Sequence, residues 1–216
     1  MSSAKDVRLQ PISASDANRF IKRQHYSGKV VQNSQLHLGA FLNGKLEGAM
    51  QFGPGINKKG QINLVEGTGW NGFIELNRMA FSDKLPRNSE SRCIGYAMRL
   101  LKKHYPQLEW VVSFADGTQC GDGTIYRASG FYLTDIRVNQ ALRINPETGE
   151  PMHSISAYHL GPEMKKRWGT WQPAQGYQLR YIYFLNPKAK DRLTVPILPF
   201  KKIDEMKARM YKGERL

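Results

Sequence analysis

An α/β fold is predicted by this sequence, because segments typical of strands and of helices alternate along most of its 216 residues. Two local patterns support the prediction most strongly. Asn43-Gly44 separates two apolar runs and is the dipeptide that best favours a two-residue β-hairpin. The run from Trp110 to Phe114 is short, apolar and continuous, as in a buried strand. Hydrophobic residues make up 40% of the chain, which is enough to bury a sizeable core.

The first half of the chain predicts one helix within a series of strands. Ser13 and Asp16 match a capping box, so a helix is expected to begin there and to run to about Gln24. The Asn43-Gly44 hairpin joins two of the strands. The strands are expected at residues 7–11, 36–42, 45–52 and 73–81.

The second half predicts two central helices among further strands. Ser89 and Ser91 are suited to cap a helix over residues 93–104, because apolar residues recur along one face of that segment. The remaining elements are expected as a strand at 110–114, a short helix at 124–129, strands from 131, at 154–158 and at 178–185, and a polar helix at 203–212.

Positive charge is in excess, with 32 Lys and Arg against 18 Asp and Glu, so a polyanion is the expected partner. Residues 161–216 hold 13 of these basic residues but only 5 of the acidic ones. Aromatic residues are interleaved there, which is typical of phosphate contacts combined with base stacking. The alternative is a solvated basic surface beside a buried strand whose rings are core. The aromatic residues concerned are Trp168, Trp171, Tyr177, Tyr181, Tyr183 and Phe184.

Membrane insertion and zinc binding through cysteines are disfavoured. No apolar run approaches the roughly 20 residues of a membrane helix, and the N-terminus has no signal-peptide core. We therefore expect no membrane partner and a cytosolic location. Cys93 and Cys120 are too few for a four-thiolate site, and a reducing compartment argues against pairing them.

The segment from Phe114 to Phe131 concentrates polar chemistry directly after the expected buried strand. It contains two carboxylates, a thiol, a tyrosine, an arginine and four glycines. Sites in α/β folds are commonly built in this way, on a glycine-containing loop at the end of a strand. The alternative is a plain connection whose glycines only permit tight turns.

Several familiar motifs are absent or incomplete. Gly67, Gly69 and Gly72 match the dinucleotide fingerprint, but a strand-like segment follows them instead of a helix that would hold a pyrophosphate, so a loop is expected. The sequence lacks the paired cysteines of a zinc deaminase and a phosphate-binding lysine loop. It also lacks the Asp/Asn-Pro-Pro-aromatic motif of adenine methyltransferases.

The order of elements resembles that of the acetyltransferase superfamily called GNAT. Residues 75–103, ELNRMAFSDKLPRNSESRCIGYAMRLLKK, are similar to its central strand, pyrophosphate loop and helix, and residues 125–133 to its later helix-to-strand junction. The resemblance implies a mixed, mainly antiparallel central sheet flanked by helices. It also implies coenzyme A contacts, for which the candidates are Arg87, Ser89, Ser91 and Arg92. The superfamily's loop usually carries two glycines after its basic residue, whereas this loop reads RNSESR.

A closer resemblance is to the Mom family of phage proteins. It rests on five blocks in order: HYSGK at 25–29, MQFGP at 50–54, ELNRMAFSD at 75–83, LPRNSESR at 85–92 and SFADGTQCGDGTIYRASGF at 113–131. That family adds a carbamoylmethyl group to the N6 amine of adenine in phage DNA and so protects the DNA from host restriction.

The Mom resemblance carries further expectations about organisation and ligands. It implies a GNAT-like catalytic domain over residues 1–185, to which we add a basic C-terminal arm over residues 186–216. It implies double-stranded DNA as the partner and the cytoplasm of the host bacterium as the location. Acetyl-CoA and iron are the cofactors that it suggests.

Chemical roles can be assigned on this resemblance. The exocyclic nitrogen of adenine is a poor nucleophile, so a base has to remove its proton, and Asp116 is the candidate. Tyr126 is a candidate to protonate a leaving group or to stack on the base, and otherwise packs its helix onto the sheet. Asp122 is an alternative base, or a cap for the helix that follows it.

Further candidates lie in the first and third matched blocks. His25 and Tyr26 are candidate catalytic residues, and with Asp116 they offer N and O ligands that suit iron. Arg78 is expected to be partly buried in a strand, where Glu75, a phosphate or the cofactor would satisfy its charge.

Two other functions remain open on the sequence. Adenine has to be flipped out of the duplex to react, and the basic C-terminal segment is the expected grip on the DNA backbone. A GNAT-type N-acetyltransferase acting on a small amine or a protein would not need that segment. A non-catalytic DNA-binding protein would use the charge alone and would not depend on Asp116.

Overall fold

The computed structural model describes residues 3–55 and 57–216. The chain forms two compact units, each assembled from three stretches of sequence. Unit 1 comprises Met1–Phe114, Gly123–Thr134 and Arg180–Pro199, and unit 2 comprises Ala115–Asp122, Asp135–Leu179 and Phe200–Leu216. The division expected at residue 185 remains a prediction.

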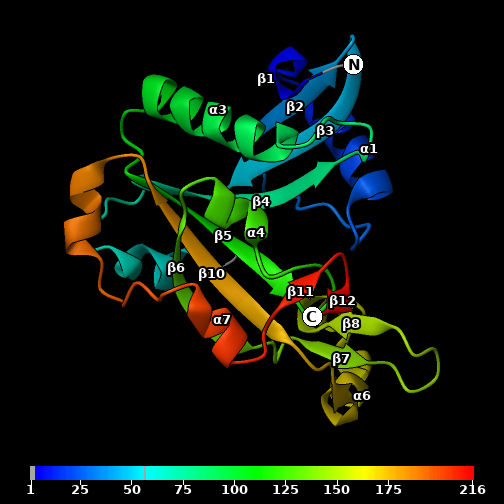
Figure 1. The fold of residues 1–216 in the computed structure, drawn as a ribbon. Helices are drawn as coiled ribbons and strands as arrows, with labels where there is room; N and C mark the ends of the chain where they lie inside the picture. Colours follow the sequence, from blue (N-terminus) through cyan, green and yellow to red (C-terminus); the bar gives the residue numbers. More distant parts are fainter. Residues whose placement is uncertain (1–2, 56) are drawn as a thin grey trace. The chain divides into compact units, whose positions relative to one another are not determined.

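Unit 1 contains most of the regular structure, and its α/β composition confirms the predicted fold class (Figure 1). Its elements are η1 (Ala4–Asp6), β1 (Arg8–Pro11), α1 (Ala14–Gln24), β2 (Leu36–Leu42), β3 (Lys45–Gly53), α2 (Lys58–Gln61), η2 (Ile62–Leu64), β4 (Phe73–Phe81), α3 (Ser89–His104), α4 (Thr124–Ala128) and η3 (Pro187–Arg192). Three strands run from one unit into the other: β5 (Trp110–Gly117), β6 (Tyr132–Val138) and β10 (Tyr177–Phe184).

The main sheet has the strand order β1-β2-β3-β4-β5-β10-β6. The first four strands pair antiparallel with their neighbours, whereas β4 and β5 pair in parallel. Asn43 and Gly44 join β2 to β3 with φ values of 50° and 76°, as a type I′ hairpin requires. The mainly antiparallel sheet is the one that the sequence resemblance implied.

Helix α1 begins and packs as the sequence predicts. The Ser13 hydroxyl accepts the backbone N–H of Asp16 at 3.0 Å, which satisfies one of the free donors of the first turn. Phe20 and Ile21 are buried against Ala49 of β3 and Ala80 of β4. The small side chains on the sheet leave room for the larger ones of the helix.

The core of unit 1 includes residues from the end of the chain. Trp110 is fully buried and stacks on Phe73, with the two ring centroids 4.4 Å apart. Ala189, Leu193 and Val195 pack into the same cluster, from the segment after β10. The cluster contains Leu64, Val65, Phe73, Trp110, Val112, Ile182 and Ala189, with partly buried neighbours around it.

Unit 2 is built from short elements. They are β7 (Leu142–Ile144), β8 (Pro151–His153), α5 (Ser154–His159), α6 (Pro162–Thr170), β9 (Gln172–Pro173), α7 (Lys201–Glu205), β11 (Met210–Tyr211) and β12 (Glu214–Arg215), together with parts of β5, β6 and β10. Strands β8, β7 and β9 form one small sheet, and β11 and β12 form another.

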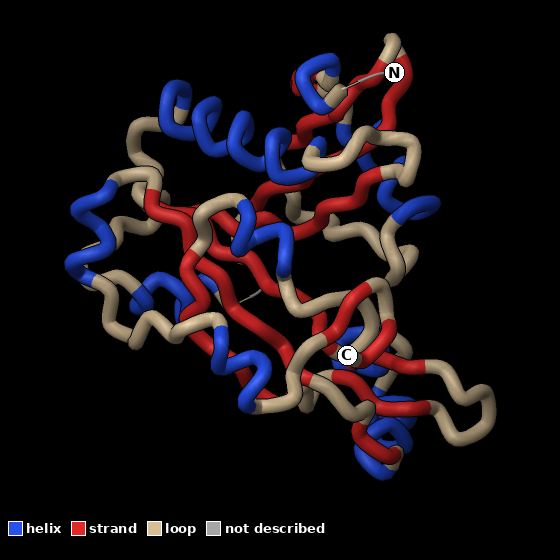
Figure 2. The backbone as a smooth tube through the Cα atoms, viewed as in Figure 1, coloured by secondary structure: helices blue, strands red, loops and turns tan. Residues whose placement is uncertain are grey.

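Two elements of unit 2 differ from the sequence prediction, as the helices and strands in Figure 2 show. The strand expected at 154–158 is wrong: this segment is α5, whose start is capped by the His153 ring accepting the Ile155 N–H. The polar helix expected at 203–212 ends instead at Glu205. Lys207 has a φ of 52°, which stops the helix, and β11 and β12 follow as a hairpin.

Two of the six aromatic residues of the C-terminal segment are buried, and the other four are half-buried. Tyr181 is fully buried, and Trp171 is buried. Trp168 donates to the Met152 carbonyl at 2.8 Å and lies against the Arg143 guanidinium, while Tyr183 packs on a neighbouring core ring. Part of the segment is therefore the buried strand with core rings, while its contact with nucleic acid remains a prediction.

In the described residues, no helix has both the length and the apolar character that crossing a membrane requires.

Candidate active site

Strands β4 and β5 separate part-way along their length. Only residues 73–75 of β4 pair with residues 110–112 of β5, although both strands continue beyond that point. The register of β4 against β3 shifts at Asn77, which has no partner between Leu76 and Arg78. A bulge of this kind bends a strand and turns its backbone groups away from the regular ladder. The separation therefore leaves the middle of β4 open toward β5.

A pair of hydroxyl groups lies where the β4–β5 ladder stops. The Ser113 Oγ of β5 is 3.1 Å from the Leu76 carbonyl of β4 and 2.8 Å from the Tyr126 hydroxyl of α4. When Ser113 donates to the carbonyl, Tyr126 donates to Ser113. Tyr126 is buried, and its ring packs against Phe131 and Tyr181 at centroid distances of 5.3 and 5.2 Å. Its ring thus packs the helix, and its hydroxyl meets β5.

Glycine is required where α4 begins. Gly123 has a φ of 84°, and a Cβ there would lie 2.4 Å from the Tyr181 ring. The left-handed conformation and the close approach together bring α4 down onto Tyr181, which positions Tyr126 over Ser113.

Replacing Tyr126 by Phe tests whether the hydroxyl acts chemically. Phe keeps the ring packing and removes only the hydroxyl group, so stability should fall by about 1 kcal/mol, the net value of one hydrogen bond. If Tyr126 donates a proton in the reaction that the enzyme catalyses, the catalytic rate of Tyr126→Phe should be lower than that of the wild type by about 10²-fold or more. Ser113→Ala is the control, because it breaks the same hydrogen bond and leaves the phenol proton. Equal, small effects of both variants on the rate would show that Tyr126 only packs.

Asp116 lies near the end of β5, in unit 2, and is held by a tight turn. Its Oδ1 accepts the Thr118 N–H at 2.9 Å, and its backbone carbonyl accepts the N–H groups of Cys120 and Gly121, both at 2.9 Å. The side chain is half-buried. The turn therefore fixes one carboxylate oxygen and the main chain of Asp116.

The neighbours of Asp116 are less suited to catalysis. The pKa of the Cys120 thiol is raised, first by burial and then by the negative charge of Asp116, so the thiol stays protonated near neutral pH. Asp122 is buried, and its backbone N–H donates to the Met210 carbonyl. Gly123 itself has no side chain to cap α4, and the cap considered from the sequence for Asp122 remains a prediction.

His25 directly follows α1 in unit 1 and is held as a neutral ring. Its Nδ1 accepts the Ser27 N–H at 3.2 Å and lies 2.8 Å from the Ser27 hydroxyl, and the ring packs on the exposed Tyr26. Burial, and secondly the charge of Arg78, lower the pKa of His25 to about 4. Because Nδ1 is an acceptor, the neutral ring carries its proton on Nε2, which then acts as a donor.

The neutral His25 makes stability depend on pH. An unfolded histidine binds a proton near its ordinary pKa of 6.5, whereas the folded one does so only at about 4. Between these values the unfolded chain binds more protons, so the folded protein loses stability as the pH falls through this window. His25→Gln should lose less stability than the wild type between about pH 7 and about pH 4.5, measured by urea unfolding. An unchanged pH dependence would contradict this account.

Arg78 ties the segment after α1 to β4. Its Nε donates to the Lys29 carbonyl at 3.2 Å, and its Nη1 donates to the Asn77 carbonyl at 2.8 Å. The pKa of Glu75 is raised above its ordinary value by burial. Hydrogen bonds from the Gln61 and Asn77 side chains and the charge of Arg78 oppose this effect only in part. Main-chain carbonyls are therefore the direct partners of Arg78, and Glu75 interacts with it only through charge.

The start of α3 has the form of an anion site. Asn88 precedes the helix with a φ of 68°, the conformation that a glycine adopts most readily, and its side chain makes no capping bond. The Ser89 N–H and hydroxyl both bond the Pro86 carbonyl, so buried Ser89 closes the turn. Asn88 thus replaces one of the glycines that the GNAT pattern expects.

Two arginines flank this helix start. Arg87 is exposed, and the Ser91 hydroxyl donates to the Asn88 carbonyl at 3.2 Å. The Arg92 Nε is buried and has no hydrogen-bond partner among the described residues. A 16-residue helix with two arginines at its N-terminus fits a pyrophosphate, because the helix dipole and the arginines both favour negative charge. These residues therefore fit coenzyme A.

The residues suggested for iron do not form a described metal site. In the described ranges, no group of three His, Cys, Asp or Glu side chains is placed to hold a metal ion. His25 and Tyr26 belong to unit 1 and Asp116 to unit 2. His25 also presents a protonated Nε2, and Asp116 has one oxygen engaged by Thr118. We derive no chemical step through iron.

Comparison with known proteins identifies the family. The profile described as the Mom protein family matches residues 6–202. The chain belongs to the Mom protein family. A Mom family relative, the methylcarbamoylase mom of Escherichia phage Mu, is 36% identical over 201 residues, which cover 90% of this chain and 82% of the relative.

A solved acetyltransferase structure shows that this Mom protein has a GNAT-like fold. The spermidine/spermine N-acetyltransferase SpeG of Vibrio cholerae matches with a TM-score of 0.50 and 11% identity, over 88% of this chain and 99% of that one. An acetyltransferase of Bacillus subtilis in complex with CoA has a TM-score of 0.48 and 10% identity, over 82% and 97%. The prediction of a GNAT-like fold is confirmed.

One contributor to the site was missed by sequence reasoning. Ser113 was quoted only as part of a block, yet it connects α4 to the point where β4 and β5 separate. A signal was available: Ser113 is the one hydroxyl in the apolar run that begins at Trp110. A hydroxyl in a buried strand needs a partner, and that partner is a candidate for the site.

Proposed function

We propose that this Mom family protein is a DNA-modifying transferase that adds a carbamoylmethyl group to the N6 amine of adenine, and so protects phage DNA from restriction. The observation that carries the proposal is the identity of 36% with a methylcarbamoylase over 90% of the chain. The GNAT fold supports transfer of a group to an amine. The excess of basic residues supports DNA as the substrate.

Asp116 is the proposed general base. The lone pair of the adenine amine is delocalised into the ring, so the proton has to leave as the new bond to nitrogen forms. One Asp116 oxygen is held by the Thr118 N–H, which leaves the other to accept that proton. A carboxylate positioned by its own turn requires little reorganisation during the reaction.

The separation of β4 and β5 is the proposed donor site. Acetyl-CoA would bind there with its pyrophosphate at the start of α3. Its acetyl group would supply two carbons, and the nitrogen of the carbamoylmethyl group would have to come from a further donor. Arg87, Ser91 and Arg92 would bind the phosphates there. The Tyr126 hydroxyl, supported by Ser113, is the proposed proton donor for a leaving group at this point.

Double-stranded DNA is the proposed partner. Adenine pairs through the amine that reacts, so the base has to leave the stack at a cost of a few kcal/mol. Tyr26 and Trp70 are exposed aromatic residues on loops of unit 1 and are suited to stack on an unstacked base. Binding should weaken steeply with salt, since counterions are released from the phosphates, and a shallow salt dependence in a DNA-binding titration would contradict this.

Nucleoside mass spectrometry tests the function. Plasmid DNA is digested from cells that express the protein and from cells with an empty vector. A deoxyadenosine heavier by one carbamoylmethyl group, found only with the protein, is expected. An acetyl group lacks the nitrogen of a carbamoylmethyl group, so the measurement has to read the whole mass of the added group. Unmodified DNA at good expression would refute the proposal.

The GNAT fold also favours a second candidate, an N-acetyltransferase for a small amine or a protein. Purified protein would then release coenzyme A from acetyl-CoA in the presence of an amine and leave DNA unmodified. Acetyl-CoA turnover that requires duplex DNA and not free polyamine would favour DNA modification instead.

A further inference from the structure

Helix α3 carries a line of cationic side chains on its exposed face. Arg92, Tyr96, Arg99 and Lys103 follow one another at intervals of four, three and four residues, which places them along one side of a helix. The opposite face, with Cys93, Ile94 and Ala97 among others, is buried. We name the four exposed or half-exposed residues the α3 stripe.

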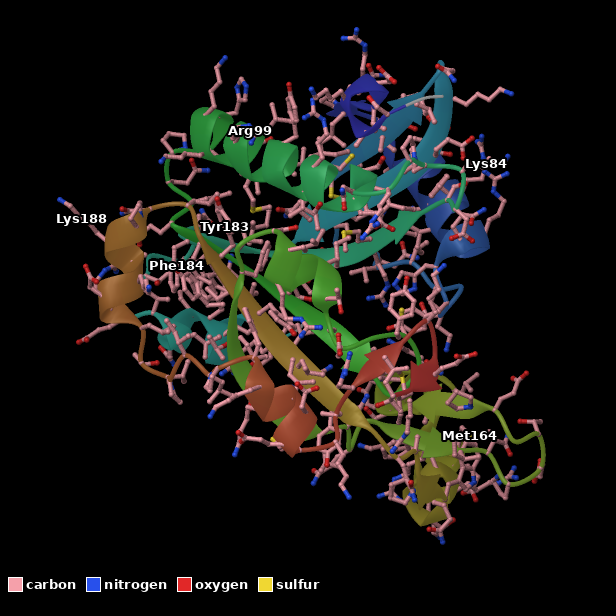
Figure 3. All side chains as sticks on the ribbon, viewed as in Figure 1. Lys84, Arg99, Met164, Tyr183, Phe184 and Lys188 are labelled. Carbon is pink, nitrogen blue, oxygen red and sulfur yellow. The ribbon has the colours of Figure 1, made fainter. Side chains whose placement is uncertain are left out.

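Tyr96 keeps two of the cations of the α3 stripe in place. The guanidinium carbons of Arg92 and Arg99 lie 5.6 and 4.6 Å from its ring centroid. These distances are typical of cation–π contacts, which restrict the side chains without neutralising them. Arg99 projects from α3, as Figure 3 shows. The ordering reduces the entropy that the arginines lose when they bind a ligand.

The positive charges of Arg99 and Lys103 in the α3 stripe are not neutralised by ion pairs among the described residues. Glu90, in the first turn, is the single acidic residue of α3. A row of ordered cations facing solvent is suited to a polyanion.

The basic C-terminal segment is different, because in the described residues acidic neighbours pair with at least five of its 13 cations. Lys202 lies 3.2 Å from a Glu205 oxygen, and Arg209 lies 3.3 Å from an Asp204 oxygen. Arg192 pairs with Glu109. Residues 161–216 hold more basic residues, but part of their charge is already used within the protein.

We propose that the α3 stripe binds the phosphate backbone of duplex DNA. From Arg92 to Lys103 the helix rises about 16 Å, and duplex DNA of that length carries about ten negative charges. Helix α3 belongs to unit 1 and contacts α4 of the same unit, which carries Tyr126. The α3 stripe is thus on a helix that packs beside a candidate catalytic residue. The inference rests on the proposed function, because it takes DNA as the substrate. It assigns binding of the DNA phosphate backbone to α3 rather than to the C-terminal segment.

The test is the salt dependence of DNA binding by the full-length protein. Binding to a fluorescein-labelled duplex is followed by fluorescence anisotropy between about 0.05 and 0.2 M salt. The variant Arg99→Ala with Lys103→Ala should reduce the slope of log K against log salt by about 1.8, which is about 0.9 for each phosphate that the variant no longer neutralises. Arg92 is left unchanged, because it also belongs to the proposed coenzyme A site.

The control removes the same charges from another helix. Lys22→Ala with Arg23→Ala takes one lysine and one arginine from the last turn of α1, which matches Lys103 in the last turn of α3. The control should change the slope by less than half as much. Equal slopes for the two variants would overturn the proposal, as would a wild-type slope in the α3 variant. Far-ultraviolet circular dichroism verifies that both variants are folded.

The outcomes separate this inference from the proposed function. If wild-type protein modifies adenine in cells and the α3 variant binds and modifies DNA normally, only the α3 stripe is refuted. If neither protein modifies DNA, the proposed function fails whatever the binding slopes are. Loss of modification in the α3 variant, restored by Arg99→Lys with Lys103→Arg, supports the stripe because those residues keep the charges.

Discussion

Asp116→Asn should reduce the rate of adenine modification by about 10²- to 10⁴-fold, the usual contribution of a general base. Asn keeps the size of the side chain and an oxygen that can accept the Thr118 N–H, so the turn after β5 should persist. What it loses is the ability to take a proton from the amine. The measurement is the initial rate of modified deoxyadenosine formation, by mass spectrometry, at equal protein concentration.

Two controls make the Asp116 result specific. Asp116→Asn should bind duplex DNA with the same slope of log K against log salt as the wild type, since one half-buried carboxylate contributes little to binding of the phosphates. Asp122→Asn should retain activity, because Asp122 is buried and its backbone is engaged by Met210. A full rate in Asp116→Asn together with an inactive Asp122→Asn would transfer the role of base to Asp122.

Removal of residues 187–216 should prevent unit 1 from folding. Ala189, Leu193 and Val195 pack into the cluster around Trp110, and Thr194 donates its N–H to the Leu64 carbonyl. Each large apolar side chain removed from such a core costs about 1.5–3 kcal/mol. Several such deletions amount to a large part of the roughly 5–15 kcal/mol that typically stabilises a domain. The measurement is the yield of folded protein and its unfolding curve in urea.

A shorter truncation is the matched control. Removing residues 200–216 takes away only residues of unit 2 and leaves every segment of unit 1 in place. The longer deletion should therefore be far more damaging than the shorter one. If both truncated proteins unfold at the same urea concentration as the full chain, the segment at 187–199 does not stabilise unit 1. Activity after deletion of residues 186–216 cannot separate DNA modification from acetyl transfer, because that deletion removes part of the fold.

Local sequence signals predicted most elements of unit 1. The Ser13 cap, the Asn43-Gly44 turn and the apolar run at Trp110 each act through neighbouring residues, and each is found as predicted. The prediction of a strand at 154–158 was wrong, because a short mixture of apolar and polar residues fits a strand or a helix equally well. There a neighbouring ring, His153, caps the first turn and favours the helix.

The candidate residues were found by their sequence blocks, but their environments were not. Asp116 and Tyr126 stand ten positions apart in one block, and yet the structure divides them between two units. Nothing in the sequence indicates that Arg78 bonds the Lys29 carbonyl, or that Ser113 meets both Leu76 and Tyr126. Such bonds join residues far apart in the chain, so no local pattern encodes them.

Turn signals, apolar periodicity and motif blocks are local properties, and they were sufficient to predict the family, the α/β class and the hairpin. Only the folded chain showed which of the candidate residues are buried. It also showed which charges are already paired and which remain free. Folding buried Trp171 and Tyr181 of the C-terminal segment and left Arg99 and Lys103 of α3 exposed. Burial and ion pairing depend on the whole packed chain, and for that reason the surface that we propose for DNA is visible only in the fold.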